Sequence, residues 1–355
     1  MSKTLRVLCI DGGGIRGVIP AELINHIEKN VIKKPLSEHF DLFAGTSTGA
    51  LIAAMLAYKK STGDYLVNTM YSYKNANIIM NKSYLDKIFG IAQIHSKYED
   101  DGKSKIIQRY TTVYGEPLLL KNTLPNKYFM TCAYDVTHGK LKFFKSWDLR
   151  DENYTLYDVL CSTSAAPSYF PMHQMKVGDE IINYADGGLF ANNLTDSVGI
   201  ELLGTKFKGY DNIEIMSLGT GAVPPPMPNI KSPSWGGIPW LKNGLIDIIF
   251  AGAIEAANYK MKVLSETNGW KYLRINKNMT IASQEMDNVS QENIKNLALE
   301  ADSWINDDII MTKLLDFFNL QKEDVIERNN SETSSENDIL QSKDSIRMLN
   351  SSIQL

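Results

Sequence analysis

Near its start the chain reads Val7-Leu8-Cys9-Ile10-Asp11-Gly12-Gly13-Gly14-Ile15-Arg16-Gly17, an apolar run followed by three consecutive glycines. Residues 5–10 are apolar with β-branched members and stop at the glycines, which predicts a buried strand that ends in a tight loop. After the loop, apolar residues recur at helical spacing through residues 15–30, so we expect a helix there. The stretch therefore predicts a strand, a glycine loop and a helix in succession.

A second unit of the same kind follows shortly afterwards. Phe40 to Ala44 is an apolar strand candidate, and it leads into Gly45-Thr46-Ser47-Thr48-Gly49 and then into an apolar helix over residues 50–58. A serine between two glycines at such a strand-to-helix turn is the pattern of a nucleophile elbow, because the glycines keep Cβ atoms out of the crowded turn. The alternative is a plain helix N-cap, a task that Thr46 or Thr48 could also perform.

The rest of the chain continues to alternate strands with helices. This order predicts an α/β protein with three α/β/α layers around a mostly parallel central sheet. We expect surface helices and loops over residues 60–125 and a Pro/Gly-rich loop over residues 222–239. Further strands are expected over residues 129–136, 141–144, 181–184, 212–218 and 271–275, and further helices over residues 156–164, 243–266 and 290–318.

Length and composition suit one large globular domain or two ordinary ones. The chain has 355 residues, of which 43% are hydrophobic and 22% charged, with a net charge of −4. Residues 1–328 are expected to form the folded domain, and the Ser/Asn/Glu-rich residues 329–355 a disordered tail. Because no chain-wide basic surface exists, we do not expect nucleic acid as a partner. The three cysteines, Cys9, Cys132 and Cys161, lie too far apart to suggest a disulfide framework or a zinc site, so no metal is predicted.

The glycine loop alone allows three interpretations. Gly12, Gly13 and Gly14 let the backbone approach closely and, with the following helix N-terminus, could donate N–H groups to an oxyanion, with Arg16 adding positive potential. The spacing that ends at Gly17 also fits a dinucleotide fingerprint, and a plain tight turn is the third interpretation. The serine elbow favours the oxyanion hole. A dinucleotide fingerprint requires an acidic residue about 20 positions after the glycines, at the end of the second strand. Glu38 is near that position, but it precedes the strand, which argues against this interpretation.

A carboxylate completes the candidate chemistry. None of the five histidines, His26, His39, His95, His138 and His173, follows the Asp186-Gly187-Gly188 motif, so the chain order of a Ser–Asp–His triad is missing. We therefore predict a dyad of Ser47 and Asp186. With an ordinary pKa of about 4, an aspartate is a weak but ionised base at neutral pH, so the oxyanion donors would carry most of the catalysis. Asp11 is the rival carboxylate, and we expect it to orient the glycine loop through backbone hydrogen bonds.

These segments together resemble the patatin-like phospholipases, and plant patatins in particular, over roughly residues 5–315. The resemblance covers the opening strand and loop, the elbow segment, Asp186-Gly187-Gly188 and the pair Asn192-Asn193. It extends to Ser162-Thr163-Ser164-Ala165-Ala166-Pro167-Ser168-Tyr169-Phe170-Pro171, to Ser217-Leu218-Gly219-Thr220-Gly221 and to residues 270–275. Ala50 and Leu194 depart from the family pattern, where a glycine and a proline are common.

The resemblance implies a patatin-like fold and a lipid acyl hydrolase, of phospholipase A or lysophospholipase type, acting on phospholipids or galactolipids. It implies Ser47 as nucleophile, Asp186 as proton acceptor, the Gly12–Gly14 backbone as oxyanion hole, and no cofactor. The competing functions are a catalytically silent lipid-binding or scaffold protein and a nucleotide-binding protein. The loop has no lysine of the Walker type, which argues against the latter.

Contact with a membrane is the remaining expectation. Trp235 and Trp240 flank a Gly/Pro-rich loop, and tryptophan favours the membrane interface, although core packing explains the pair equally well. No apolar stretch approaches 18 residues, so we expect a cytoplasmic protein that binds membranes peripherally. Secretion without a cleaved signal and an unknown activator stay open.

Overall fold

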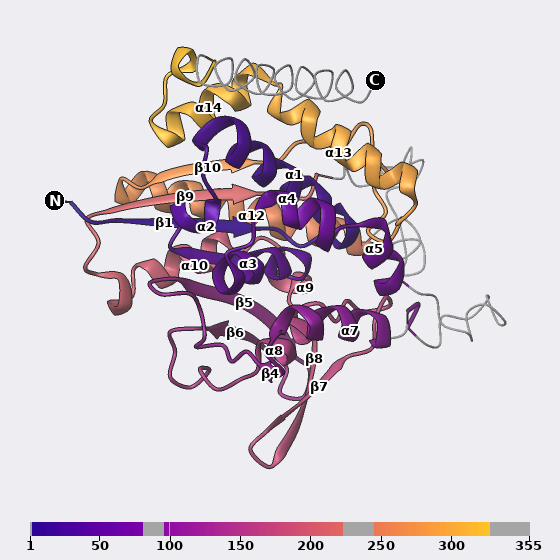
Figure 1. Ribbon diagram of the computed structural model, residues 1–355. Helices are drawn as coiled ribbons and strands as arrows, with labels where there is room; N and C mark the ends of the chain where they lie inside the picture. The colour runs from indigo at the N-terminus through magenta and orange to yellow at the C-terminus, as the bar shows by residue number, and fades with distance from the viewer. Residues whose placement is uncertain (1, 81–95, 99, 223–244, 327–355) are drawn as a thin grey trace, which may run out of the picture.

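The apolar run before the glycines forms β1 (Thr4–Ile10), which lies inside the central sheet of the computed structural model in Figure 1. The structure describes residues 2–80, 96–98, 100–222 and 245–326. The expected tail, most of the Pro/Gly-rich loop, and both Trp235 and Trp240 lie outside the described residues.

The sheet has eight strands and two halves. From one edge, β10 (Lys271–Ile275), β9 (Asn212–Leu218), β1, β2 (Leu42–Gly45) and β5 (Tyr128–Asp135) run parallel to one another. Beyond them β8 (Glu180–Asp186) and β7 (His173–Val177) are antiparallel, as is β6 (Lys140–Lys145), which also pairs with β5. The prediction of a mostly parallel sheet in a three-layer α/β/α fold is confirmed.

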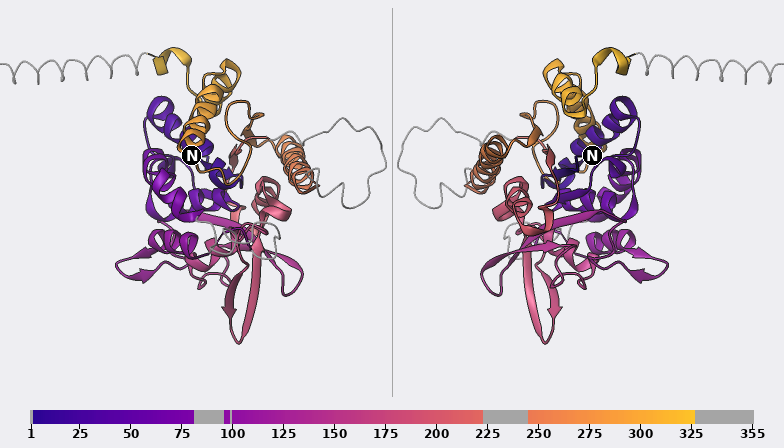
Figure 2. Two further views of the ribbon diagram at one scale, coloured as in Figure 1. Left: turned by 90° about the vertical axis from the view of Figure 1, so that its right-hand side faces the viewer. Right: turned by 90° about the vertical axis from the view of Figure 1, so that its left-hand side faces the viewer.

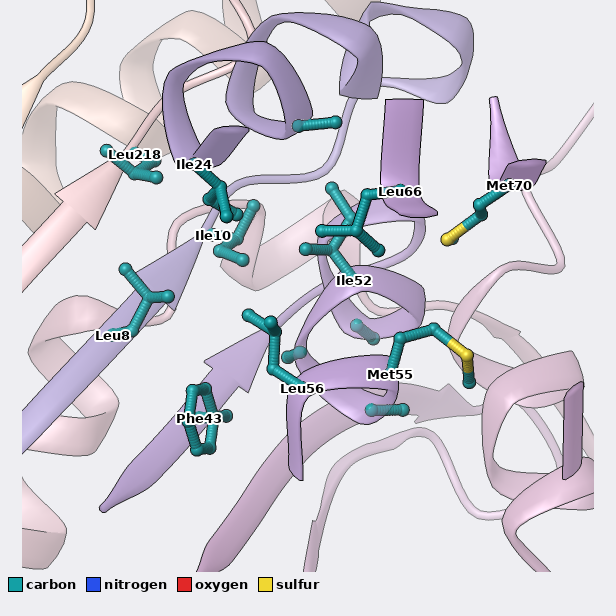
Figure 3. Packing of buried hydrophobic residues seen from close by; sticks show 14 of the residues in the cluster. Leu8, Ile10, Ile24, Phe43, Ile52, Met55, Leu56, Leu66, Met70 and Leu218 are labelled. Carbon is teal, nitrogen blue, oxygen red and sulfur yellow. The ribbon is translucent and has the colours of Figure 1, made fainter. Parts of the chain in front are cut away.

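Both faces of the sheet are buried around the second half of β1, as the apolar run Val7-Leu8-Cys9-Ile10 predicts. Leu8 and Ile10 face one cluster, and Val7 and Cys9 face the other. On the first face α1 (Val18–His26), α3 (Thr48–Lys59) and α13 (Gln291–Ile305) cover the sheet, and Figure 3 shows Ile52 of α3 among these side chains.

On the second face lie α9 (Gly188–Ala191), α10 (Thr195–Leu202) and α12 (Leu245–Asn268). Figure 2 shows α12 and the first-face helices on opposite sides of the sheet.

Two helices differ from the prediction. The helix expected over residues 15–30 begins as a 3-10 turn, η1 (Gly14–Gly17), and ends as η2 (Ile27–Ile32) after α1. The helix expected over residues 290–318 is two helices, because the Asp307 carboxylate accepts the N–H groups of Ile309 and Ile310 and so starts α14 (Asp308–Phe318). Strand β7 was not predicted, since its alternating polar residues gave only a weak signal.

The remaining elements pack around this frame. They are α2 (Leu36–His39), α4 (Gly63–Tyr65), η3 (Leu66–Met70), α5 (Tyr73–Ile79), α7 (Asp100–Thr111), β3 (Thr112–Val113), β4 (Glu116–Pro117), α8 (Leu156–Thr163) and η4 (Thr205–Phe207). Among them, α8 contacts β5, β7 and β8. Cys9, Cys132 and Cys161 are all buried and unpaired, as predicted. Among the described residues, no helix combines the length and apolar character that crossing a membrane requires.

Candidate active site

The glycine loop and the serine elbow meet at one edge of the sheet. β1 and β2 are parallel neighbours, and their last paired residues are Ile10 and Gly45. The loops that follow the two strands therefore emerge side by side. A Cβ on Gly49 would strike the carbonyl oxygens of Ile10 and Asp11, so only glycine lets α3 start this close to β1.

Asp186 reaches the same edge by a different route. Strand β8 is antiparallel to β5, and Asp186, its last residue, pairs with Ala133. The last pair between β2 and β5 is Ala44 with Met130, three residues earlier along β5. β8 thus ends just beyond the end of β2, and an aspartate from an antiparallel strand arrives beside the elbow.

Ser47 has the strained backbone expected of an elbow. Its φ and ψ are 54° and −123°, outside the regions that most L-residues adopt. Ser47 stands at the N-cap position of α3, but its side chain caps no N–H group. The Thr46 hydroxyl donates to the Ala191 carbonyl at 2.7 Å, and the Thr48 hydroxyl binds that of Tyr71. None of the three hydroxyls caps the helix, so the plain N-cap interpretation is wrong.

Two threonines, Thr163 and Thr131, support the backbone of the elbow. The Ser47 backbone N–H donates to the Thr163 hydroxyl at 3.1 Å, and the Thr163 hydroxyl lies 2.9 Å from that of Thr131 on β5. Thr163 is the last residue of α8, and both threonines are fully buried. Neither threonine was predicted to support the elbow, although Thr163 lies in a segment that carried the family resemblance.

The Asp186 carboxyl is buried and hydrogen-bonded. Burial raises its pKa to about 6, while the Gly188 N–H, the Ser47 hydroxyl and the Lys103 ammonium each oppose the rise by favouring the ionised form. The Gly188 N–H donates to Oδ1 at 2.7 Å, and the Asp186 backbone N–H donates to the Ala165 carbonyl at 2.9 Å. The carboxyl is thus a stronger base than an ordinary aspartate, and the Ser47 hydroxyl lies near enough to favour its ionised form.

The glycine loop is fixed by its carbonyl groups. The Gly12 carbonyl accepts from Thr220 Oγ1 at 2.7 Å and from Asn192 Nδ2 at 3.2 Å, and the Gly13 carbonyl accepts the Arg16 N–H at 3.2 Å. In a trans peptide the N–H points opposite to the carbonyl, so the N–H groups of Gly13 and Gly14 are turned away from these partners.

The three glycine N–H groups differ in what they bind. The Gly12 N–H donates to the Asn192 carbonyl at 3.1 Å. Within the described ranges the N–H groups of Gly13 and Gly14 have no hydrogen-bond acceptor. Gly13 and Gly14, unlike Gly12, therefore have backbone N–H groups that can donate to an oxyanion.

Asp11 and Arg16 flank the glycine loop in sequence and bind different partners. The Asp11 carboxylate forms a bidentate ion pair with Arg274 at 2.6 and 3.2 Å, and its backbone N–H donates to Leu218. Its carboxylate thus binds a side chain of β10 rather than the loop backbone that we expected it to orient. The Arg16 guanidinium is almost buried and its Nε lies 3.4 Å from the Gly13 carbonyl. Sequence reasoning missed Arg274, although residues 270–275 carried part of the resemblance.

The other predicted glycines sit where a side chain would collide. A Cβ on Gly17 would strike Tyr71 and Thr48, one on Gly45 would strike Gly49, and one on Gly187 would strike Cys132. At Gly188, a Cβ would press on the Asp186 carboxylate at 3.0 Å. These glycines serve the close packing of the three motifs.

The described histidines bind elsewhere. His173 Nε2 lies 3.0 Å from the Asp158 carboxylate, His138 pairs with Asp135, and His26 contacts Asn30. His39 packs against Phe40, and His95 lies outside the described residues. No histidine in the described part of the chain hydrogen-bonds to Ser47 or Asp186. Nor do three His, Cys, Asp or Glu side chains gather there as metal ligands would.

Comparison with known proteins agrees with this geometry. The family model described as patatin-like phospholipase matches residues 8–198, the span from β1 into α10 that holds the glycine loop, the elbow and Asp186. The chain belongs to the patatin-like phospholipase family. Membership implies lipid acyl hydrolase activity, in agreement with the resemblance.

Relatives in plants match this patatin-like chain over most of its length. Patatin-like protein 2 of Oryza sativa subsp. indica is 28% identical, over 83% of this chain and 82% of its own. Patatin-like protein 2 of Arabidopsis thaliana is 28% identical, over 87% and 84% respectively. Patatin group D-3 of Solanum tuberosum is 26% identical, over 84% and 82%. Among solved structures, VipD from Legionella pneumophila aligns with a TM-score of 0.36 and 14% identity, covering 84% of this chain and 67% of VipD.

Proposed function

We propose that this patatin-like protein hydrolyses acyl esters of membrane phospholipids or galactolipids, with Ser47 as nucleophile and Asp186 as general base. The observation that carries the proposal is that the strained elbow serine faces a buried carboxyl. The Ser47 hydroxyl lies near enough to lower the pKa of the Asp186 carboxyl, which burial raises to about 6. At pH 7 to 8 such a carboxyl is mostly ionised, yet it accepts a proton more readily than an ordinary aspartate.

The first half of the reaction forms an acyl-enzyme. As Ser47 Oγ attacks the ester carbonyl carbon, its proton passes to the Asp186 carboxylate, and a tetrahedral oxyanion forms. The N–H groups of Gly13 and Gly14 are the proposed donors to that oxyanion, aided by the helix N-terminus that begins at Gly14. When the C–O bond of the ester breaks, Asp186 returns the proton to the leaving alcohol, and the acyl group stays on Ser47.

The second half releases the fatty acid. A water molecule gives a proton to Asp186 while its oxygen attacks the acyl carbon, which again places an oxyanion on the glycine loop. Collapse of this intermediate breaks the bond to Ser47 Oγ, which takes the proton back from Asp186. The products are a fatty acid and the starting enzyme, and no cofactor enters the scheme.

The proposed substrate is a membrane lipid, so we also propose peripheral membrane contact by a cytoplasmic protein, with Trp235 and Trp240 as candidate contact residues. Replacing both tryptophans by alanine would then lower vesicle binding and vesicle turnover, with little effect on a soluble ester. Equal binding and equal vesicle turnover by the double variant would contradict the interfacial role.

The proposal is tested by fatty-acid release from vesicles of mixed phospholipids and, separately, from galactolipid vesicles. We would compare the wild type with Ser47→Ala and Asp186→Asn, and include Asp179→Asn as a control, because Asp179 is exposed in the turn between β7 and β8. The proposal expects release by the wild type and the control alone. If no variant acts on vesicles, a soluble activated ester separates two cases. Turnover that needs Ser47 means a competent enzyme that lacks its activator or lipid, and no turnover means a silent lipid-binding protein.

A further inference from the structure

A lysine is buried close to the candidate dyad. Lys103 lies on α7, and its side chain is only 4% exposed, which is unusual for lysine. Its ammonium pairs with Asp100 at 3.0 Å, donates to the Ser164 carbonyl at 3.3 Å and lies 4.6 Å from the centre of the Phe170 ring. The charge is therefore held in one place by three contacts, one from its own helix and two from the stretch between α8 and β7.

The same segment that holds Lys103 also holds Asp186. The Ser164 carbonyl accepts from Lys103, and the next carbonyl, that of Ala165, accepts the Asp186 backbone N–H at 2.9 Å. One short turn after α8 thus fixes the ammonium and the carboxyl relative to each other. Because both groups are shielded from water, their interaction is weakened less than that of a surface pair.

The charge of Lys103 is one of three influences that favour the ionised form of Asp186, with the Gly188 N–H and the Ser47 hydroxyl. Burial alone would drive the Asp186 carboxyl toward its neutral form, and the Lys103 ammonium opposes this by lowering its pKa. Asp100 pairs with the same ammonium and partly neutralises it. Because its charge is negative, we expect any effect of Asp100 on Asp186 to have the opposite sign to that of Lys103.

We propose that Lys103 is a positioning residue that keeps the Asp186 carboxyl ionised and ready to accept the Ser47 proton, and that Asp100 moderates this effect. The inference rests on the proposed function, because it assigns a role to a neighbour of the proposed base. It adds a residue from α7, a helix that carries none of the three motifs.

Other titratable groups face Asp186 or the Lys103–Asp100 ion pair, and none of them is a buried cation like Lys103. Cys132 on β5 faces Asp186, and both remain buried. The groups that face Lys103 and Asp100 from α8 and β7 are Tyr157, Asp158, Cys161 and His173. His173 and Asp158 are bound to each other, so they contribute little net charge when His173 is protonated. The cysteines and the tyrosine titrate far above the acid limb of the reaction.

The test is the pH dependence of kcat/KM on a soluble activated ester for the wild type, Lys103→Met, Lys103→Arg and Asp100→Asn. Activity needs ionised Asp186, so it falls as the pH drops through the pKa of that group. Loss of the positive charge in Lys103→Met raises this pKa, and we expect the acid limb to move up by about one pH unit. Asp100→Asn removes a negative charge and should move the limb to lower pH. Lys103→Arg should stay near the wild type.

The control is Lys105→Met, on the same helix, because Lys105 is 73% exposed and pairs with Asp101 at the surface. The proposal is overturned if Lys103→Met lowers kcat/KM equally at every pH and leaves the acid limb of the pH profile where it is in the wild type. That result would mean a merely structural role for Lys103. A shift of the same sign in Lys103→Met and Asp100→Asn would also overturn the proposal.

A second measurement separates this inference from the proposed function. Carboxyl NMR titration of Asp186 in the wild type and Asp100→Asn reads the pKa without catalysis. A lower pKa in Asp100→Asn supports the role of the pair even if Ser47→Ala shows that turnover does not need Ser47. An unchanged or higher pKa overturns it, and the Asp100→Asn result stands even if Lys103→Met does not fold.

Discussion

The backbone N–H of Ser47 donates to the side-chain hydroxyl of Thr163, 116 positions away in the sequence, at 3.1 Å. This bond ties the strained elbow to the end of α8, and Thr131 on β5 supports Thr163 in turn. The turn after α8 also carries the carbonyl that binds the Asp186 N–H. The position of the nucleophile and that of the base therefore depend on one helix end.

Thr163→Val should disturb the elbow with little change in side-chain volume. The variant leaves the Ser47 N–H without its acceptor, at a cost of about 1 kcal/mol in the free energy of unfolding. We expect a larger relative effect on kcat, about tenfold, because the Ser47 hydroxyl is no longer held against Asp186. Denaturant unfolding and ester turnover measure the two effects. Thr312→Val is the control, since Thr312 bonds only within α14, and equal kcat in both variants would contradict the role of Thr163.

The buried Asp186 carboxylate should lower the free energy of unfolding at neutral pH. The pKa of the carboxyl is about 6 in the folded protein against 3.8 for an ordinary aspartate, so the folded state binds the proton more tightly. The stability contributed by the protonated carboxyl is fully present below pH 4 and is lost as the pH rises through 6, by about 3 kcal/mol in total.

The matching variant is Asp186→Asn, which removes the buried charge. It should be more stable than the wild type at pH 8, and the difference should vanish near pH 4. Thermal unfolding across this pH range checks the prediction. A variant that is less stable than the wild type at pH 8 and equally so at pH 4 would show that burial does not raise this pKa.

Gly13→Ala should impair the oxyanion loop. A Cβ at this position would strike Thr220 Oγ1, the group that fixes the Gly12 carbonyl and with it the direction of the Gly13 N–H. Loss of one oxyanion donor typically costs about 10²–10³ in kcat. Gly209→Ala is the matched control, because a Cβ there meets no atom within 4 Å. A Gly13→Ala enzyme with normal kcat would place the oxyanion donors elsewhere.

Arg274→Gln should destabilise the fold by leaving the buried Asp11 carboxylate unpaired, at a cost of about 3–5 kcal/mol. The double variant Asp11→Asn/Arg274→Gln should recover much of that loss, since amide side chains can hydrogen-bond to each other. Urea unfolding of both variants, with Arg150→Gln as an exposed control, measures the coupling. Strictly additive losses would mean that the pair does not act as a unit.

The parts of the site that could be predicted from sequence are those built from neighbouring residues. β1, the glycine loop and the elbow are each encoded within about ten residues, where apolar runs meet glycines. The absence of a histidine after Asp186 was equally plain from the sequence. These patterns were enough to predict Ser47 and Asp186 as a dyad.

The supporting groups could not be predicted in the same way. Thr163 and Arg274 come from distant segments, and only the folded chain brings them to Ser47 and Asp11. Lys103 lies in a region that we expected to be surface, because lysine is almost always exposed and its burial depends on α8 packing against α7. Gly12 resembles its two neighbours in sequence, but its N–H is occupied by Asn192, a partner 180 positions away.

The central claim is that Ser47 is the group that becomes acylated. The most direct measurement is labelling with a fluorophosphonate probe at pH 8, followed by mass spectrometry of peptides from the wild type, Ser47→Ala and Asp186→Asn. We predict one adduct, on Ser47, which is absent in Ser47→Ala and forms much more slowly in Asp186→Asn. No adduct on the wild type, or an adduct on another residue that persists in Ser47→Ala, would contradict the account.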